Sequence, residues 1–166
     1  MPIQTPICDF GQKAHDFKLK STDNKIISLN DVKGENGTLI MFICNHCPYV
    51  KAVTKDIVED SKKLKDRGIN SVAICANDSE NYPEDSFENM ILFAKKHQFS
   101  FPYLVDETQE IAKTYDAVCT PDFFGYNKNL ELQYRGRIRE LKKLKPVREG
   151  DSDLKKAMKL IAETGK

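Results

Sequence analysis

The clearest chemistry in this sequence belongs to two cysteines, Cys44 and Cys47, within the segment 44–48 (Cys-Asn-His-Cys-Pro). An apolar run precedes this segment, and a pattern typical of a helix follows it. The thiolate is the reactive form of cysteine, and the N–H groups and positive dipole end at a helix N-terminus favour it. Two cysteines within one helical turn can also close a small disulfide ring and reopen it by exchange. The spacing therefore predicts thiol–disulfide chemistry.

The two cysteines are expected to have different roles. Cys44 is predicted to be the attacking thiol, more exposed and more acidic than its partner, and Cys47 is predicted to resolve the mixed disulfide. His46 is a second group that can carry positive charge beside the Cys44 thiolate, or else a solvent-exposed spacer. Lys51, one turn further on, either adds to the positive electrostatic field at the Cys44 thiolate or simply belongs to a solvated helix face.

A metal site is the main structural alternative at the same place. Cys44, His46 and Cys47 could bind zinc or, as soft ligands of a copper-binding protein, Cu(I). Zinc usually takes four ligands, and the sequence has no second cysteine or histidine pair. The nearest candidate for a distal copper ligand is His97, which has no special context. The sequence therefore predicts no metal and no cofactor.

Length and composition limit the other classes of function. The 166 residues predict a single domain over 1–166, and a net charge of +1 with both signs interspersed predicts no nucleic-acid partner. The longest apolar stretch, 39–44, is too short to span a membrane, and the N-terminus lacks signal-peptide features. Five irregularly spaced cysteines do not form an extracellular disulfide framework. A cytoplasmic location is expected.

The elements that would position the cysteines follow from apolar periodicity and from capping and turn residues. The predicted strands are a hairpin of 17–19 and 26–29, then 39–43, 69–76 and 103–105, and a second hairpin of 122–126 and 130–135. The predicted helices are 49–67 ending at Gly68, one through 87–97 capped by Asp85 with Glu88, a short one from Asp106 and Gln109 to about Tyr115, and 151–163. Segment 140–151 is expected to be the least ordered. The order predicts an α/β fold with a central mixed sheet flanked by helices.

Three motifs in this order resemble a known family. They are Gly11-x-x-Ala14-x-Asp16-Phe17-x-Leu19, the C-x-x-C motif, and Thr120-Pro121 before a strand. Together they resemble the thioredoxin fold, and in particular its redoxin branch, which contains the alkyl hydroperoxide reductase/thiol-specific antioxidant and TlpA-like proteins. The resemblance covers the chain from about Gly11 to the last helix. It implies a thioredoxin-like fold with a β-α insertion, 69–97, between the C-x-x-C motif and a cis-proline.

The resemblance also implies roles for individual residues. Pro121 in cis would place the Thr120 backbone beside the disulfide, where an extended substrate could pair with it. Cys119 would lie nearby, as a third thiol or as a small buried apolar side chain. The order of Cys and His in the motif is similar to that of the oxidising DsbA-type proteins.

Two positions depart from the thioredoxin pattern. Ile43 stands where tryptophan is usual, and Thr38 stands about where thioredoxin has a buried acid that assists proton transfer. The usual base is therefore missing from its usual position. A different rate or direction of exchange is expected.

The predicted function is that of a thiol–disulfide oxidoreductase, acting as a monomer or weak dimer. Its partners would be protein or small-molecule disulfides and dithiols, and an electron donor that the sequence does not identify. A thiol peroxidase is the alternative. The peroxiredoxin pattern Pro-x-x-x-Thr/Ser-x-x-Cys fits neither cysteine, since Met41 and Gly37 precede Cys44 at the required positions. An alternative in which Cys47 reacts with the peroxide and Cys44 is the resolving thiol stays open.

Overall fold

The computed structural model describes residues 11–45, 48–76, 83–115, 117, 121–136, 141–142, 145–146 and 153–164. Their main feature is a mixed seven-stranded sheet in the order β2-β1-β5-β4-β3-β6-β7. The strands are β1 (Lys18–Ser21), β2 (Ile26–Ser28), β3 (Gly37–Phe42), β4 (Ile69–Cys75), β5 (Tyr103–Val105), β6 (Asp122–Asn127) and β7 (Leu132–Gly136). β3, β4 and β5 are parallel neighbours, and the remaining pairings are antiparallel. The predicted mixed sheet is confirmed.

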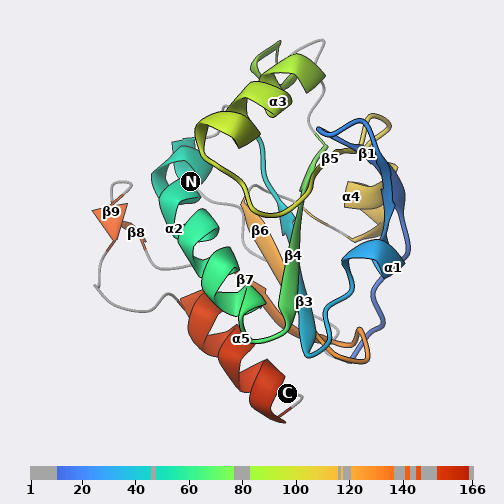
Figure 1. Ribbon diagram of the computed structural model, residues 1–166, viewed down its shortest axis with the longest axis vertical. Coiled ribbons are helices and arrows are strands. Elements are labelled where there is room, and N and C mark those ends of the chain that lie inside the picture. The colour runs from blue at the N-terminus through green and yellow to red at the C-terminus, as the bar shows by residue number, and fades with distance from the viewer. Residues whose placement is uncertain are drawn as a thin grey trace.

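Helices cover both faces of this sheet (Figure 1). They are α1 (Leu29–Val32), α2 (Pro48–Lys65), the 3-10 turn η1 (Pro83–Asp85), α3 (Phe87–Lys96), α4 (Glu110–Thr114) and α5 (Asp153–Thr164). α2 and α5 lie on one face, α1 and α4 lie on the other, and α3 crosses the end of the sheet. Among the described residues, no helix is long and apolar enough to cross a membrane.

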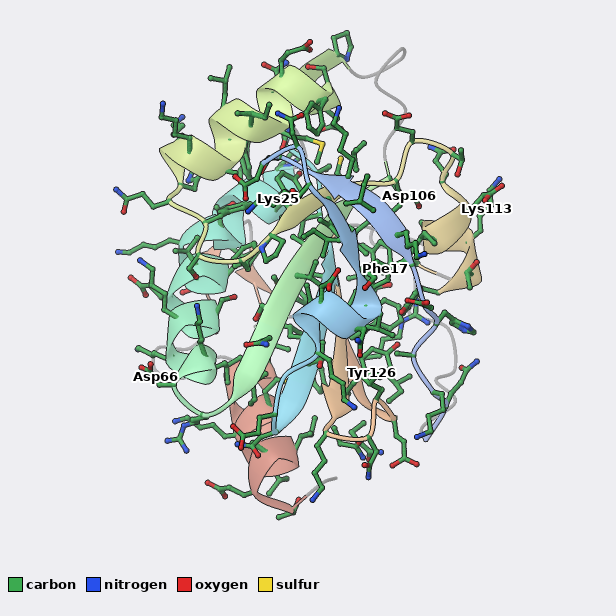
Figure 2. The ribbon with its side chains drawn as sticks, turned by 45° about the vertical axis from the view of Figure 1, so that its right-hand side comes forward. Phe17, Lys25, Asp66, Asp106, Lys113 and Tyr126 are labelled. Atoms are coloured by element: carbon green, nitrogen blue, oxygen red, sulfur yellow. The ribbon has the colours of Figure 1, made fainter. Side chains whose placement is uncertain are left out.

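The two faces of the sheet have separate apolar cores. Leu39 and Met41 of β3 pack with the apolar sides of α2 and α5, whereas Ile40 and Phe42 pack in the opposite cluster. Phe17 and Tyr126, labelled in Figure 2, belong to this second cluster. All six residues of β3 are buried, because successive side chains point to opposite faces and both faces are covered.

Most of the predicted elements are present, with differences at their ends. α2 ends at Lys65, earlier than predicted, and Gly68, with a positive φ of 80°, closes the turn that follows by donating its N–H to the Lys65 carbonyl at 3.0 Å. The short helix α1 was not predicted. It begins at Leu29, after the N-cap Ser28, which forms a capping box with Asp31. The sequence suggested that the strand continued to Leu29. A small hairpin of β8 (Leu141–Lys142) and β9 (Lys145–Pro146) lies in the segment expected to be least ordered.

The predicted cap of α3 is wrong. Ser86, not Asp85, is the N-cap, and its hydroxyl accepts a hydrogen bond from the Asn89 N–H at 3.3 Å. The Asp85 carboxylate instead forms a contact with the segment that follows β3, described below. The predicted start of α4 is confirmed in part, since the Asp106 carboxylate accepts the Ala112 N–H at 2.9 Å and Gln109 is the N-cap.

Candidate active site

The segment after β3 carries the first cysteine of the motif to one end of the sheet. The Ile43 N–H donates to the Ile74 carbonyl at 3.0 Å, so pairing with β4 continues one residue beyond β3. Cys44 follows, and α2 begins at Pro48. Cys44 therefore lies at the carboxyl ends of two parallel strands, where sites in α/β proteins commonly gather.

Cys44 is buried, and the predicted difference in exposure between Cys44 and Cys47 stays a prediction, because Cys47 lies outside the described residues. The Cys44 side chain is 1% accessible and belongs to the core cluster that includes Val50 of α2, Cys75 of β4 and Met90 of α3. Here α3 packs over this end of the sheet and encloses it (Figure 1).

Asn45, between the two cysteines, is held by two buried residues from other elements. Its backbone N–H donates to the Asp85 carboxylate at 2.6 Å, and its side-chain oxygen accepts the Tyr103 hydroxyl at 2.9 Å. Asp85 is 2% and Tyr103 1% accessible. Buried hydrogen bonds, particularly those to a charged group, are costly to break without replacement. These bonds fix the backbone directly after Cys44.

The Tyr103 hydroxyl also adjoins the buried thiols. Burial raises the pKa of Tyr103 well above its ordinary value, and its neighbours Cys75, Cys44 and Asp85 raise it further. Tyr103 therefore stays a neutral hydrogen-bond donor at physiological pH. Cys75 is buried in the same cluster.

Pro121 lies at the same end of the sheet as Cys44. It directly precedes Asp122, which opens β6 and pairs with Phe42, the last residue of β3. Pro121 is half-buried. The sheet therefore places Pro121 at the same end as Cys44, and the predicted role of Pro121 beside a disulfide stays a prediction. The other predicted site residues, His46, Cys47, Cys119 and Thr120, lie outside the described residues.

A buried ion pair stands beside Pro121. The Arg135 guanidinium of β7 donates to the Asp122 carboxylate at 2.8 Å, and both side chains are 4% accessible. Arg135 also lies over the ring of Phe124, 4.5 Å from its centroid. Arg135 thus links β7 to β6.

Thr38, at the position of the thioredoxin acid, has a structural contact. It is fully buried, and its hydroxyl accepts the Gly34 N–H at 3.0 Å at the start of β3. The carboxylate that the sequence analysis missed is Asp85, which reaches the motif from η1. The Tyr-Pro-Glu-Asp string at 82–85 was a visible signal, but a cap of the next helix explained it locally.

The metal alternative depends on His46 and Cys47, which the structure does not describe. Within the described part of the chain, no group of three histidine, cysteine, aspartate or glutamate side chains could hold a metal ion.

The fold defines the class of protein. A solved thioredoxin-family thiol:disulfide interchange protein from Chlorobium tepidum has the same fold, with a TM-score of 0.71 and 16% identity over 94% of this chain and 99% of that one. The predicted thioredoxin-like fold is confirmed. Residues 10–141 match the model of the AhpC/TSA family, and the chain belongs to that family.

Two relatives are more similar in sequence. An uncharacterized conserved protein from Geobacillus kaustophilus is 40% identical, with a TM-score of 0.92 over 98% of this chain and 87% of its own. The thiol-disulfide oxidoreductase ResA of Bacillus thuringiensis is 26% identical over 121 residues, which are 73% of this chain and 65% of that protein.

Proposed function

We propose that this protein is a thiol–disulfide oxidoreductase in which Cys44 and Cys47 alternate between a dithiol and a disulfide. The observation that carries the proposal is the position of Cys44, between the central strand β3 and the N-terminus of α2 in an AhpC/TSA chain. The similarity to ResA, a named thiol-disulfide oxidoreductase, supports the same activity.

The start of α2 favours an ionised thiol. This helix has 18 residues, no acidic residue in its first turn, and lysines in its last turn. Its N-terminal N–H groups and dipole therefore stabilise a nearby thiolate without competition from a carboxylate in the same turn. His46, when protonated, would add a second positive charge.

The reaction proceeds in two exchanges. The Cys44 thiolate attacks one sulfur of a substrate disulfide, an S–S bond to Cys44 forms, and the substrate S–S bond breaks, so that one substrate sulfur leaves and takes up a proton. The Cys47 thiol then loses its proton, and the resulting thiolate attacks the Cys44 sulfur and releases the second substrate thiol. The substrate gains two electrons and two protons, and the protein is left with the Cys44–Cys47 disulfide. A dithiol donor reverses these steps.

Burial of Cys44 affects the first step. A protein disulfide reaches the Cys44 sulfur only when the segment held by Asp85 and Tyr103 opens. The Thr120-Pro121 segment then offers backbone groups for an extended substrate, so the proposed substrates are protein or small-molecule disulfides and dithiols. The proposed compartment is the cytoplasm.

Trapping variants test the roles of the two cysteines. In Cys47→Ser, a mixed disulfide between Cys44 and the substrate should accumulate, because no resolving thiol remains. In Cys44→Ser, neither turnover nor trapping should occur. Mass spectrometry of the adducts after reaction with a disulfide peptide identifies the linked cysteine. Adducts on Cys47 in Cys44→Ser, with none on Cys44 in Cys47→Ser, would show that the roles are reversed.

One observation favours a second candidate function, that of a thiol peroxidase. A thiol that is 1% accessible suits a substrate as small as a peroxide better than a protein disulfide. Attack by the thiolate would break the O–O bond, release water or an alcohol and leave a sulfenic acid, which the other cysteine would convert to the disulfide with loss of water. Consumption of hydrogen peroxide faster than exchange with any disulfide would favour this function.

A further inference from the structure

A groove next to Cys44 has a chemical character of its own. It has a volume of about 510 Å³ and lies between the segment after β3, the first turns of α2, and α3. Asn45 and Lys51 form one side, and the other side is formed by residues of α3 and its C-cap, His97. Figure 1 shows the C-terminal end of α3 close to the start of α2. A ligand in this groove touches the residue directly after Cys44.

The described lining of the groove is cationic. Lys51 comes from α2 and Lys96 from the last turn of α3, and no lining residue in the described part of the chain is acidic. The N-terminus of α2 adds positive potential on the Lys51 side. Burial lowers the pKa of His97, and the nearby charge of Lys96 lowers it further, so His97 is neutral at pH 7. The two ammonium groups therefore set the charge of the groove, which favours an anion.

The groove also has an apolar wall. Leu92 is 61% accessible, although it is a large apolar side chain, and it lines the groove together with Phe93. Exposed leucine is common and alone indicates nothing. Beside two lysines and a reactive cysteine, however, it gives the groove two recognition chemistries, one for negative charge and one for an apolar side chain.

We propose that this groove binds an acidic segment of the protein substrate, one that carries an apolar residue close to its carboxylates. The proposal rests on the proposed function, since the same segment would present its disulfide to Cys44. In an extended segment, alternate side chains point to the same side, so one stretch can place a carboxylate at the lysines and an apolar side chain on Leu92. The volume is in the range of ligand-binding pockets and holds a few side chains.

The test uses synthetic disulfide peptides of about eight residues that differ only beside the cysteine, with Glu-Leu, Lys-Leu or Glu-Ser there. At low ionic strength, the reduced protein should exchange with the Glu-Leu peptide about tenfold faster than with the Lys-Leu peptide. Removal of leucine should slow exchange, and high salt should reduce the preference for charge, because salt screens exposed charges. Equal rates for the three peptides would overturn the proposal.

Matched variants locate the effect. Lys96→Glu should abolish the preference for the acidic peptide, whereas Lys95→Glu should retain it, since Lys95 has the same charge in the same last turn but does not line the groove. Leu92→Ser should lose the effect of the peptide leucine, and Leu160→Ser, at an exposed leucine of α5, should not. If Lys95→Glu and Lys96→Glu lost the preference for the acidic peptide equally, the peptide would recognise the net charge of the protein and not the groove.

Two further measurements separate this proposal from the proposed function. The rate with the uncharged 2-hydroxyethyl disulfide is the reference to which the peptide rates of each variant are normalised, and failure to reduce this disulfide or any peptide would contradict the oxidoreductase activity. A fluorescent, cysteine-free Glu-Leu peptide should still bind, as measured by anisotropy, and its binding should weaken in Lys96→Glu. A preference for anions confined to oxidised glutathione would overturn the assignment to a protein segment.

Discussion

Asn45 shows how the residue after a reactive cysteine is fixed by contacts far away in the sequence. Its N–H is bonded to Asp85, 40 residues later, and its side chain to Tyr103, 58 residues later. Both partners are buried and lie next to the thiol cluster. The contacts fix the residue directly after Cys44, and we expect the accessibility of the buried thiol to depend on how often they break.

Removal of the Asp85 carboxylate should expose Cys44. In Asp85→Ala the buried Asn45 N–H loses its partner, at a cost of about 1–3 kcal/mol in the free energy of unfolding. A loss of about 1.4 kcal/mol from the closed state raises the open fraction about tenfold, and alkylation of Cys44 should accelerate accordingly. Urea denaturation and mass spectrometry of iodoacetamide-treated protein measure the two effects.

Asp106→Ala is the matched control for this variant. Asp106 is also a buried aspartate that accepts a backbone N–H, but it holds α4, beside which it is labelled in Figure 2. It should lower stability without accelerating the alkylation of Cys44. Equal alkylation in the wild type and Asp85→Ala, with stability lost in the variant, would contradict the role of Asp85.

At the scale of single residues, the sequence predicts which side chains can react better than it predicts which residues surround them. The proposed reactive pair, Cys44 and Cys47, follows from spacing alone, because two thiols within one predicted helical turn have few other uses. The contacts of Asp85 do not follow, since a local rule assigned it to the cap of α3 and Ser86 fills that position. The exposure of Cys44 depends on the packing of α3, which no property of its neighbours in sequence specifies.

Among the elements, α5 is held against the sheet through a glycine. Gly125 of β6 pairs with Leu39 of the central strand, and a Cβ at this position would lie 2.5 Å from the Met158 sulfur of α5 and 3.1 Å from the Tyr134 Cβ. The absence of a side chain at Gly125 allows the helix to approach this closely. The packing of α5 against β6 therefore depends on Gly125 and Met158.

Gly125→Ala should destabilise the protein by about 1–3 kcal/mol, because the added methyl group overpacks the interface with α5. Met158→Ala shortens the side chain that it meets. The double variant should therefore be less destabilised than the sum of the two single variants, as measured by urea denaturation. If the losses in free energy of unfolding were additive, the contact between position 125 and Met158 would not be the cause of the destabilisation.

The long elements were predictable, whereas the short helix α1 was not. β3, β4 and α2 follow from continuous apolar runs or helical periodicity over several turns. α1 has four residues, and its first, Leu29, continues the apolar pattern of the preceding strand. For so short a helix, packing against the sheet decides the structure more than periodicity does.

The whole molecule has two cores that differ in chemistry. The core under α2 and α5 contains the thiols and Tyr103, and the opposite core contains Tyr115 and Tyr126. Burial is the largest cause that raises the pKa of all three tyrosines above the ordinary value. The folded protein therefore keeps three phenols neutral at a pH where the unfolded chain ionises them.

This difference predicts a loss of stability at alkaline pH. An unfolded tyrosine ionises near pH 10, while the buried ones stay protonated, so the unfolded state binds fewer protons and stability falls as the pH rises above about 10. Each neutral tyrosine contributes up to about 1.4 kcal/mol per pH unit. Urea denaturation between pH 8 and 11 should show this fall, and Tyr126→Phe should reduce its slope. An unchanged slope in Tyr126→Phe would show that the buried Tyr126 hydroxyl does not cause the loss of stability at alkaline pH.

The thioredoxin-like fold of the whole chain was predictable because several motifs occur in the right order, although each alone is weak. The central claim is that Cys44 and Cys47 form a reversible disulfide. The most direct test is the redox equilibrium of the protein, measured by alkylation and mass spectrometry across a graded dithiol buffer. We predict one cooperative two-electron transition confined to Cys44 and Cys47 and unchanged in Cys75→Ala, with a midpoint near roughly −270 mV for a reductant or roughly −120 mV for an oxidant. No disulfide at any potential, or oxidation only by peroxide to a sulfenic acid, would contradict it.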